Sequence, residues 1–272
     1  MKSLKYDMHR PECREGDWQL LSEDNRNIWQ QIASETNGIV TPANAIDVLS
    51  VAAEVKVQKD LVSGHENMIS ASSSNPDEVD ADDIRQIFLD GAQRKMTALK
   101  YDGGLALVDK LDGMIASNTG TSSRIGEYVD ASRDAMVTVM KLVSRWRIGE
   151  ISSADLMMLG GPKLLNIVAT GIETARGREV HTSLVDKGNE ALRALTIVSF
   201  DARELIKTQY QVDAVNDGAL PHEAVRPEVY ERGLYLQADK VQKELLGAGF
   251  ASGALAGAIK LTKSASCRNK FS

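Results

Sequence analysis

The sequence has few of the residues that build sheets or form covalent cross-links. Of its 272 residues, 5% are aromatic, 6 are proline and 2 are cysteine. Strands are enriched in aromatic and β-branched residues, whereas Ala, Leu and charged residues, which dominate here together with Val, favour helices. No alternation of apolar and polar residues with hairpin signals stands out either. The composition therefore predicts an all-α protein with one large core or two modest ones.

Motifs that bind metals, cofactors or reacting substrates are also missing. Cys13 and Cys267 lie near opposite ends of the chain and form no CxxC pair, and the four histidines form no HExxH pair. The sequence contains no Walker-type GxxxxGKS or GxxxxGKT loop, no GxSxG and no EF-hand spacing. Its nearest glycine-rich segment, Gly160–Lys163 (GGPK), is interpreted as a turn between helices. We therefore expect no cofactor, no metal and no catalytic residues.

Acidic residues outnumber basic residues over most of the chain. The formal net charge is -6, from 32 Lys and Arg residues against 38 Asp and Glu residues. A general nucleic-acid-binding protein usually carries a basic face, so the net charge disfavours nucleic acid as a partner. From Arg226 to Ser272, however, eight basic residues oppose four acidic ones. An acidic body and a basic C-terminal end are complementary, which suits a homo-oligomer.

Residues 1–20 contain no long apolar run. They are charged throughout and lack the apolar core of a signal peptide, so we expect synthesis in the cytoplasm without a Sec-type signal. The final location stays open between a particle and export by a signal-independent route. We predict a mobile N-terminal arm (1–20), a helical segment (21–72), an acidic linker (73–83), the main helical bundle (84–262) and a basic tail (263–272).

Apolar residues recur at helical spacing along most of the chain. The spacing predicts seven to nine helices, in one bundle or in two sub-bundles. Sequence signals also place helix boundaries: starts at Ser22, Thr41-Pro42, Ser123 and Pro227, and a break or kink at Gly103-Gly104.

The helix that follows Ser123 carries a long apolar stripe. Its members include Met136, Val139 and Val143, and the stripe leads to Trp146. A stripe with this spacing lies along one face of an amphipathic helix, so it predicts a long helix that ends at Gly149.

One basic-aromatic cluster lies on the same predicted helix, in the sequence KLVSRWR. Lys141, Arg145, Trp146 and Arg147 are candidate contacts for an anion, a lipid headgroup or a nucleic-acid strand, because Arg and Trp side chains both stack and pair. The alternative is a helix end whose cations complement the C-terminal dipole while Trp146 packs inward.

A glycine-rich segment, Leu245–Leu261, stands near the C-terminus. Gly249, Gly253 and Gly257 recur every four residues, which would form a smooth ridge on one helix face. Such ridges let two helix backbones approach closely. Glycine costs about 1 kcal/mol relative to alanine in a helix, so this helix needs a partner surface. We predict that the ridge packs within the chain's own bundle, against a sister subunit or in a membrane.

Length and hydropathy limit the membrane alternative. The segment has about 17 residues, near the lower limit for a span. Its six strongly apolar side chains favour insertion by only about 2 to 3.6 kcal/mol. The cations that follow, without an acid between them, would suit anionic headgroups: Lys260, Lys263, Arg268 and Lys270.

Three classes of function fit these features. The first is a non-enzymatic structural or assembly protein, of virion, capsid-associated or scaffold type, that self-associates through its helices. The second is a membrane-active helical protein, of pore-forming or translocator type, that uses the C-terminal glycine ridge. The third is an all-α enzyme, which no motif supports. The sequence favours the first class.

Overall fold

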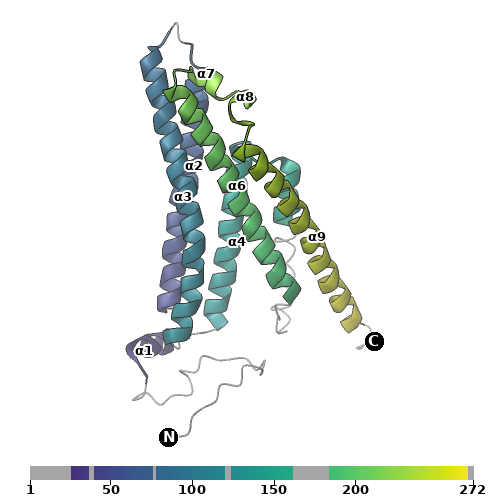
Figure 1. Ribbon diagram of the computed structural model, residues 1–272. Helices are drawn as coiled ribbons and strands as arrows, with labels where there is room; N and C mark the ends of the chain where they lie inside the picture. Colours follow the sequence, from purple (N-terminus) through teal and green to yellow (C-terminus); the bar gives the residue numbers. More distant parts are fainter. Residues whose placement is uncertain (1–25, 37–39, 76–77, 120–123, 162–183, 269–272) are drawn as a thin grey trace. The chain divides into compact units, whose positions relative to one another are not determined.

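The computed structural model describes residues 26–36, 40–75, 78–119, 124–161 and 184–268. Within these ranges the chain forms helices joined by turns, and no strand occurs in them. The predicted all-α helical bundle is therefore confirmed. Figure 1 shows the helices in chain order: α1 (Ile28–Glu35), α2 (Pro42–Ser73), α3 (Ala81–Thr119), α4 (Arg124–Arg147), a helix at 153–161, α6 (Leu184–Asn216), α7 (Pro221–Ala224), α8 (Pro227–Tyr230) and α9 (Leu234–Arg268).

The first two helices begin at side-chain caps. Asn27 Oδ1 accepts a hydrogen bond from the Gln30 amide at 2.9 Å, and Gln30 Oε1 accepts one from the Asn27 amide at 3.0 Å. This capping box starts α1. Ser22, the expected start, lies outside the described residues. At the second helix the predicted start is confirmed, since Pro42 is its first residue and Thr41 Oγ1 accepts a hydrogen bond from the Asn44 amide.

Two other predicted boundaries differ from the structure. The expected break at Gly103-Gly104 is wrong, because α3 continues without interruption to Thr119. Two glycines cost about 2 kcal/mol of helix propensity, which a helix of 39 residues tolerates. The final helix does not start at Pro227 either, since only the short α8 begins there. Gly233 adopts a φ of +51°, which suits glycine, and α9 starts at the next residue.

The second helix extends further into the serine-rich segment than its composition indicates. The hydroxyl groups of Ser72 and Ser73 donate hydrogen bonds to the carbonyl oxygens of Met68 and Ile69, at 2.7 and 2.9 Å. These bonds run back four residues along the helix and satisfy hydroxyl groups that would otherwise compete with the helix backbone. The turn between α2 and α3 is therefore shorter than the predicted linker.

The chain forms two compact units. The first contains residues 1–51 and 107–134, and the second contains residues 52–106 and 135–272. In the first unit, Arg133 of α4 and Asp47 of α2 form an ion pair at 2.5 Å, and both side chains are almost fully buried. The turn that joins α2 to α3 lies inside the second unit.

In the second unit, an apolar core lies between the two helices that this turn joins. Met68 and Ala71 of α2 pack with Ile84, Phe88 and Ala92 of α3, together with Val215 and Ala224. The two helices therefore form an antiparallel hairpin. Further clusters surround Leu61 with Leu99, and Leu142 with Phe200.

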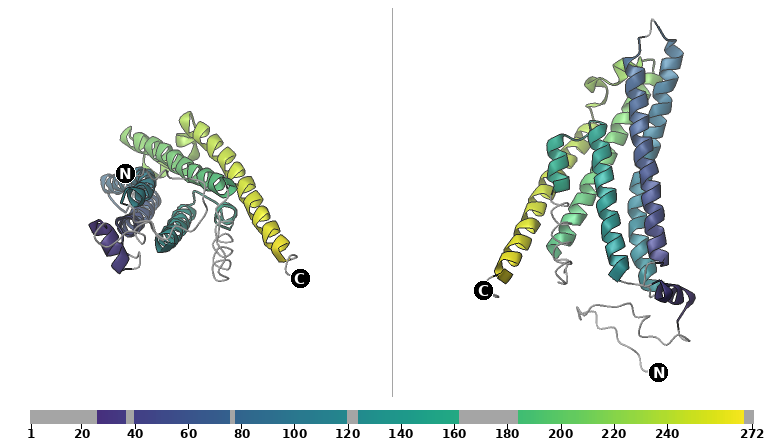
Figure 2. Two further views of the ribbon diagram at one scale, coloured as in Figure 1. Left: turned by 90° about the horizontal axis from the view of Figure 1, so that it is seen from below. Right: turned by 180° about the vertical axis from the view of Figure 1, so that it is seen from behind.

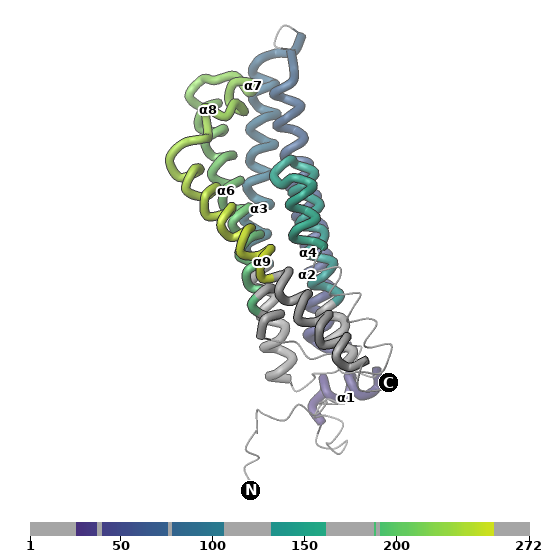
Figure 3. The backbone as a smooth tube through the Cα atoms, turned by 90° about the vertical axis from the view of Figure 1, so that its right-hand side faces the viewer, coloured from purple at the N-terminus to yellow at the C-terminus, as the bar shows by residue number. Residues whose placement is uncertain are grey.

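The long helices α6 and α9 lie side by side in the second unit (Figures 2 and 3). The hydroxyl group of Thr196 contacts the carbonyl oxygen of Leu245 at 3.3 Å, and Arg203 pairs with Asp239 at 3.0 Å. Charged and polar contacts therefore join these helices, in addition to apolar ones.

Candidate functional site

The interior of the second unit alternates between apolar and charged layers. Along α3 the buried face runs through Phe88, Ala92, Lys95, Leu99 and Asp102, which are three or four residues apart. This spacing places all five on one helix face. Side chains such as Lys, Arg and Asp are almost never fully buried unless they are paired. Lys95, Asp102 and their buried partners therefore form the candidate site.

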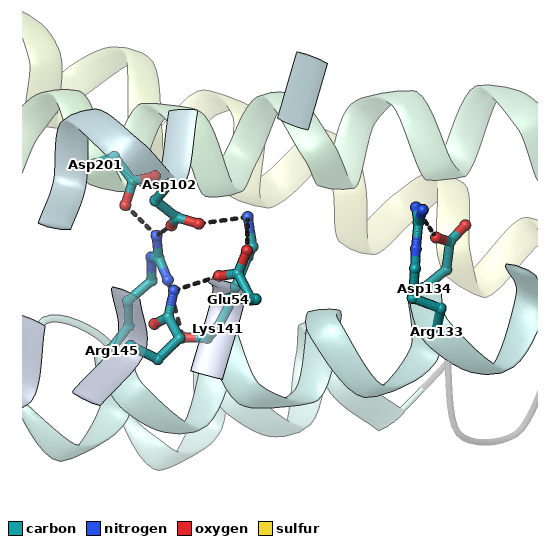
Figure 4. Close-up of polar contacts among 8 residues, drawn as sticks. Glu54, Asp102, Arg133, Asp134, Lys141, Arg145 and Asp201 are labelled. Carbon is teal, nitrogen blue, oxygen red and sulfur yellow. Dashed lines mark hydrogen bonds and ion pairs between the residues drawn. The ribbon is translucent and has the colours of Figure 1, made fainter. Parts of the chain in front are cut away.

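Five charged side chains from four helices meet around Asp102, and we call them the ion cluster: Glu54 (α2), Asp102 (α3), Lys141 and Arg145 (α4) and Asp201 (α6). Figure 4 shows the Arg145 guanidinium group beside the carboxylates of both Asp102 and Asp201. Lys141 Nζ lies 2.5 Å from Asp102 Oδ1 and 3.5 Å from Glu54 Oε2. Three carboxyl groups thus share two cations.

Local contacts fix the geometry of the ion cluster. Arg145 Nη1 donates a hydrogen bond to the Lys141 carbonyl oxygen one turn earlier, at 3.0 Å. Gln58 Nε2 donates one to Glu54 Oε1 at 2.6 Å, from the next turn of α2. The Arg145 side chain has no solvent-exposed surface. Buried ion pairs are conditional on such geometry, because the cost of removing charges from water is repaid only by well-placed partners.

Burial and neighbouring charge push the pKa values of the three carboxyl groups apart. Burial, and then the charge of Asp102, raises the pKa of Glu54 to about 7. Burial also raises the pKa of Asp201 to about 7, although Arg145 opposes the rise. At Asp102 the effect of burial is outweighed by Arg145 and Lys141, which hold its pKa well below the usual range. Near neutral pH, Asp102 is therefore ionised, whereas Glu54 and Asp201 are each partly protonated.

A second buried ion pair lies two turns along α3. Lys95 Nζ is 2.5 Å from Glu204 Oε1 of α6, and Lys207 Nζ is 3.2 Å from the same oxygen. Burial lowers the pKa of Lys95, with opposition from Glu204. At Glu204 the two lysines outweigh burial and hold the pKa well below the usual range. His65 Nδ1 lies 3.4 Å from Lys95 Nζ, and burial, followed by the Lys95 charge, lowers the pKa of His65 to about 4.

Glu150, in the turn after α4, contributes another buried carboxyl group. Among the described residues, none donates a hydrogen bond to either of its carboxylate oxygens. Burial, and then the charge of Glu204, raises the pKa of Glu150 to about 8, so it carries a proton at neutral pH. Its backbone carbonyl oxygen accepts a hydrogen bond from Arg203 Nη2 at 3.1 Å. An ionised carboxylate would be costly at this position, and the proton removes that cost.

The candidate anion-binding cluster on α4 does not form one exposed surface. Lys141 and Arg145 are buried and bind carboxylates, so the expected contact of these two with lipid or nucleic acid does not hold. Trp146 is 46% exposed and its Nε1 donates a hydrogen bond to Ser153 Oγ at 3.1 Å, so it does not pack inward. Arg147 is exposed and pairs with Glu66. Of the four candidate residues on α4, only Trp146 and Arg147 are exposed to solvent.

The first glycine of the predicted ridge faces a helix of the same chain. Gly249 is buried, and a Cβ atom added to it would lie 3.6 Å from Thr196 Oγ1 of α6. Gly253, Gly257, Lys260, Lys263 and Arg268 belong to α9, but their side-chain positions, like Lys270 as a whole, lie outside the described residues. In the described residues no helix has a stretch that is long and apolar enough to cross a membrane.

The ion cluster was not predicted from the sequence, although a signal for it exists. Lys141, Arg145 and Ile148 are spaced by four and three residues, as a buried helix face would be. The described residues contain no group of three or more His, Cys, Asp or Glu side chains that could hold a metal ion. What the cluster can do is bind, share and release protons. No protein-family model, no curated protein and no solved structure matches this chain.

Proposed function

We propose that the protein is a structural or scaffold component, without enzymatic activity, that self-associates through an outward apolar face of α4. The observation that carries this proposal is the exposure of four apolar side chains on that helix. Met136, Val139, Val143 and Trp146 are 54%, 37%, 43% and 46% exposed. Their spacing of three, four and three residues places them in one stripe, which matches the seam of a coiled coil.

The α4 stripe, defined as these four residues, has the anatomy of a protein interface. Trp146 is held by its hydrogen bond to Ser153, so a large aromatic side chain is fixed in an exposed position. Tryptophan is enriched among the residues that dominate binding energy. The Arg147–Glu66 ion pair, at 2.7 Å and exposed on both sides, lies next to Trp146 and supplies a polar rim. Contiguous exposed apolar surface of this kind typically marks a partner site.

The proposed occupant is a second copy of the chain. The acidic body and the basic C-terminal segment supply complementary charges for assembly, as the sequence indicates. Two copies that meet through the same stripe would form a symmetric contact, the commonest arrangement in homo-oligomers. Virion, capsid-associated and scaffold proteins are the classes in which such a chain would serve.

Light scattering coupled to size-exclusion chromatography tests this proposal. The mass of the wild-type protein is expected to rise with concentration, and Val143→Lys should shift it to the monomer. Val79→Lys is the matched control, because Val79 is 41% exposed in the turn before α3, away from the stripe. A wild-type protein that stays monomeric at every concentration would refute self-association. Equal effects of the two substitutions would refute the role of the stripe.

A further inference from the structure

The ion cluster contains a geometry that requires protons. Glu54, Asp102 and Asp201 are almost fully buried against the same two cations. Within the cluster, Asp102 contacts both Lys141 and Arg145, whereas Glu54 contacts Lys141 and Asp201 contacts Arg145. A buried carboxyl group with little positive charge beside it is stabilised by a proton. Asp102 is therefore the member that stays ionised, and Glu54 and Asp201 are the members that hold protons.

The charge balance of the cluster accounts for at least one of these protons. Three carboxyl groups lie against Lys141 and Arg145, so full ionisation leaves one uncompensated negative charge in the interior. Gln58 on α2 is neutral, and Glu150 in the turn after α4, which also faces Arg145 and Asp201, adds a carboxyl group rather than a cation. The nearest further charged groups on α3 and α6 pair with one another or with other partners: Lys95, Arg203, Glu204 and Lys207. On α2, His65 contacts Lys95.

We propose that the ion cluster is a buried proton-binding site, and that loss of its protons above neutral pH loosens the packing of α2, α3, α4 and α6. When Glu54 and Asp201 release their protons, the cluster gains negative charge that its two cations do not balance. Three like charges then face one another with two cations between them. Because the four helices contribute one or two members each, the repulsion acts across every helix contact at this layer.

The direction of the pH effect follows from where the protons are held. In the unfolded chain both carboxyl groups lose their protons by about pH 5. In the folded chain they keep them to about pH 7, as their raised pKa values show. The folded state therefore binds more protons between pH 5 and 7, and its stability falls as the pH rises through this range. For each proton that the folded chain holds and the unfolded chain does not, the unfolding equilibrium constant increases about tenfold per unit rise in pH.

Urea unfolding of the full chain between pH 5 and pH 8.5 tests the site. The wild-type unfolding constant should increase with pH, less steeply above pH 7, where Glu150 with its pKa of about 8 still releases a proton. Glu54→Gln and Asp201→Asn each keep a hydrogen-bond donor but cannot lose a proton, so each should reduce the slope by about one tenfold step per pH unit. Asp60→Asn, an exposed carboxyl group on the same helix as Glu54, should leave the slope unchanged.

Infrared spectroscopy of the wild-type protein keeps the proposal testable if a variant fails to fold. The carbonyl band of protonated carboxylic acids should be present at pH 6 and should decrease by pH 8.5, where Glu150, with a pKa of about 8, keeps part of it. Expected results are this band and the reduced slopes of both variants. A wild-type stability that is flat or rises with pH, slopes in the variants equal to that of Asp60→Asn, or the absence of the band at pH 6 would each overturn the proposal.

Discussion

Gly64 of α2 and Gly91 of α3 meet backbone to backbone. A Cβ atom added to Gly64 would lie 2.7 Å from the carbonyl oxygen of Gly91, and one added to Gly91 would lie 2.8 Å from the carbonyl oxygen of Gly64. No larger residue fits either position without moving a helix. The same Cβ on Gly64 would lie 2.7 Å from the backbone nitrogen of Lys95, so this close contact also sets the depth at which Lys95 enters the core.

Replacement of either glycine by alanine is therefore expected to destabilise the protein. Alanine gains about 1 kcal/mol in helix propensity, but the overlap with backbone atoms costs more, so Gly64→Ala and Gly91→Ala should lose about 1–2 kcal/mol net. Gly103→Ala is the control, because it lies on α3 with nothing within 4 Å of its added Cβ atom. It should gain up to about 1 kcal/mol in urea unfolding. Equal effects at Gly91 and Gly103 would contradict the close contact.

The sequence predicted the helices well and the helix contacts poorly. Long apolar periodicity identifies a helix, and the cap at Thr41-Pro42 fixes a start. A close glycine contact gives no comparable signal, since Gly64 and Gly91 are single residues in two different helices. The repeated glycines that begin at Gly249 predict a helix contact because they form a pattern within one helix. The Gly64–Gly91 contact depends on the relative position of two helices, which periodicity does not encode.

The ion cluster was missed because an apolar stripe of α4 faces outward and two of its cations face inward. Apolar stripes normally face the core. On α4, however, Met136, Val139 and Val143 are exposed, while Lys141 and Arg145 point inward. Partners for buried cations come from α2, α3 and α6, and pairing over such sequence distances cannot be inferred from composition. The site therefore required the tertiary structure.

Loss of Arg145 should be among the most damaging single substitutions in the second unit. Arg145→Met would leave Asp102 and Asp201 without their shared guanidinium group, and breaking a buried ion pair costs about 3–5 kcal/mol. Arg147→Met, two residues later, removes only an exposed pair with Glu66 and should cost less than about 1 kcal/mol. Urea unfolding at pH 6 compares the two variants. A loss at Arg145 no larger than that at Arg147 would show that the cluster adds no stability.

His65 should produce a stability change of opposite sign on the acid side. Its pKa is lowered from 6.5 to about 4, so the unfolded chain binds a proton more readily between these values. Stability is then lost as the pH falls from about 6.5 to 4. His65→Asn should remove this contribution, worth up to about 3 kcal/mol at pH 4, whereas His222→Asn on the exposed part of α7 should not. If both variants keep the wild-type acid slope, His65 is not the responsible group.

The contact of Gly249 with α6 leads to a prediction that separates two kinds of substitution. The added Cβ of Gly249→Ala would make an ordinary contact with Thr196 Oγ1 at 3.6 Å, so alanine should fit and gain up to about 1 kcal/mol in helix propensity. Gly249→Leu places three more carbon atoms toward α6 and should cost about 1–3 kcal/mol. Gly247 has nothing within 4 Å of its added Cβ atom, so Gly247→Leu is the matched control and should not destabilise. Thermal unfolding of the four proteins, wild type included, checks the order. If Gly249→Leu is as stable as Gly247→Leu, α9 does not depend on this contact with α6, and its glycines would be free to pack against another surface.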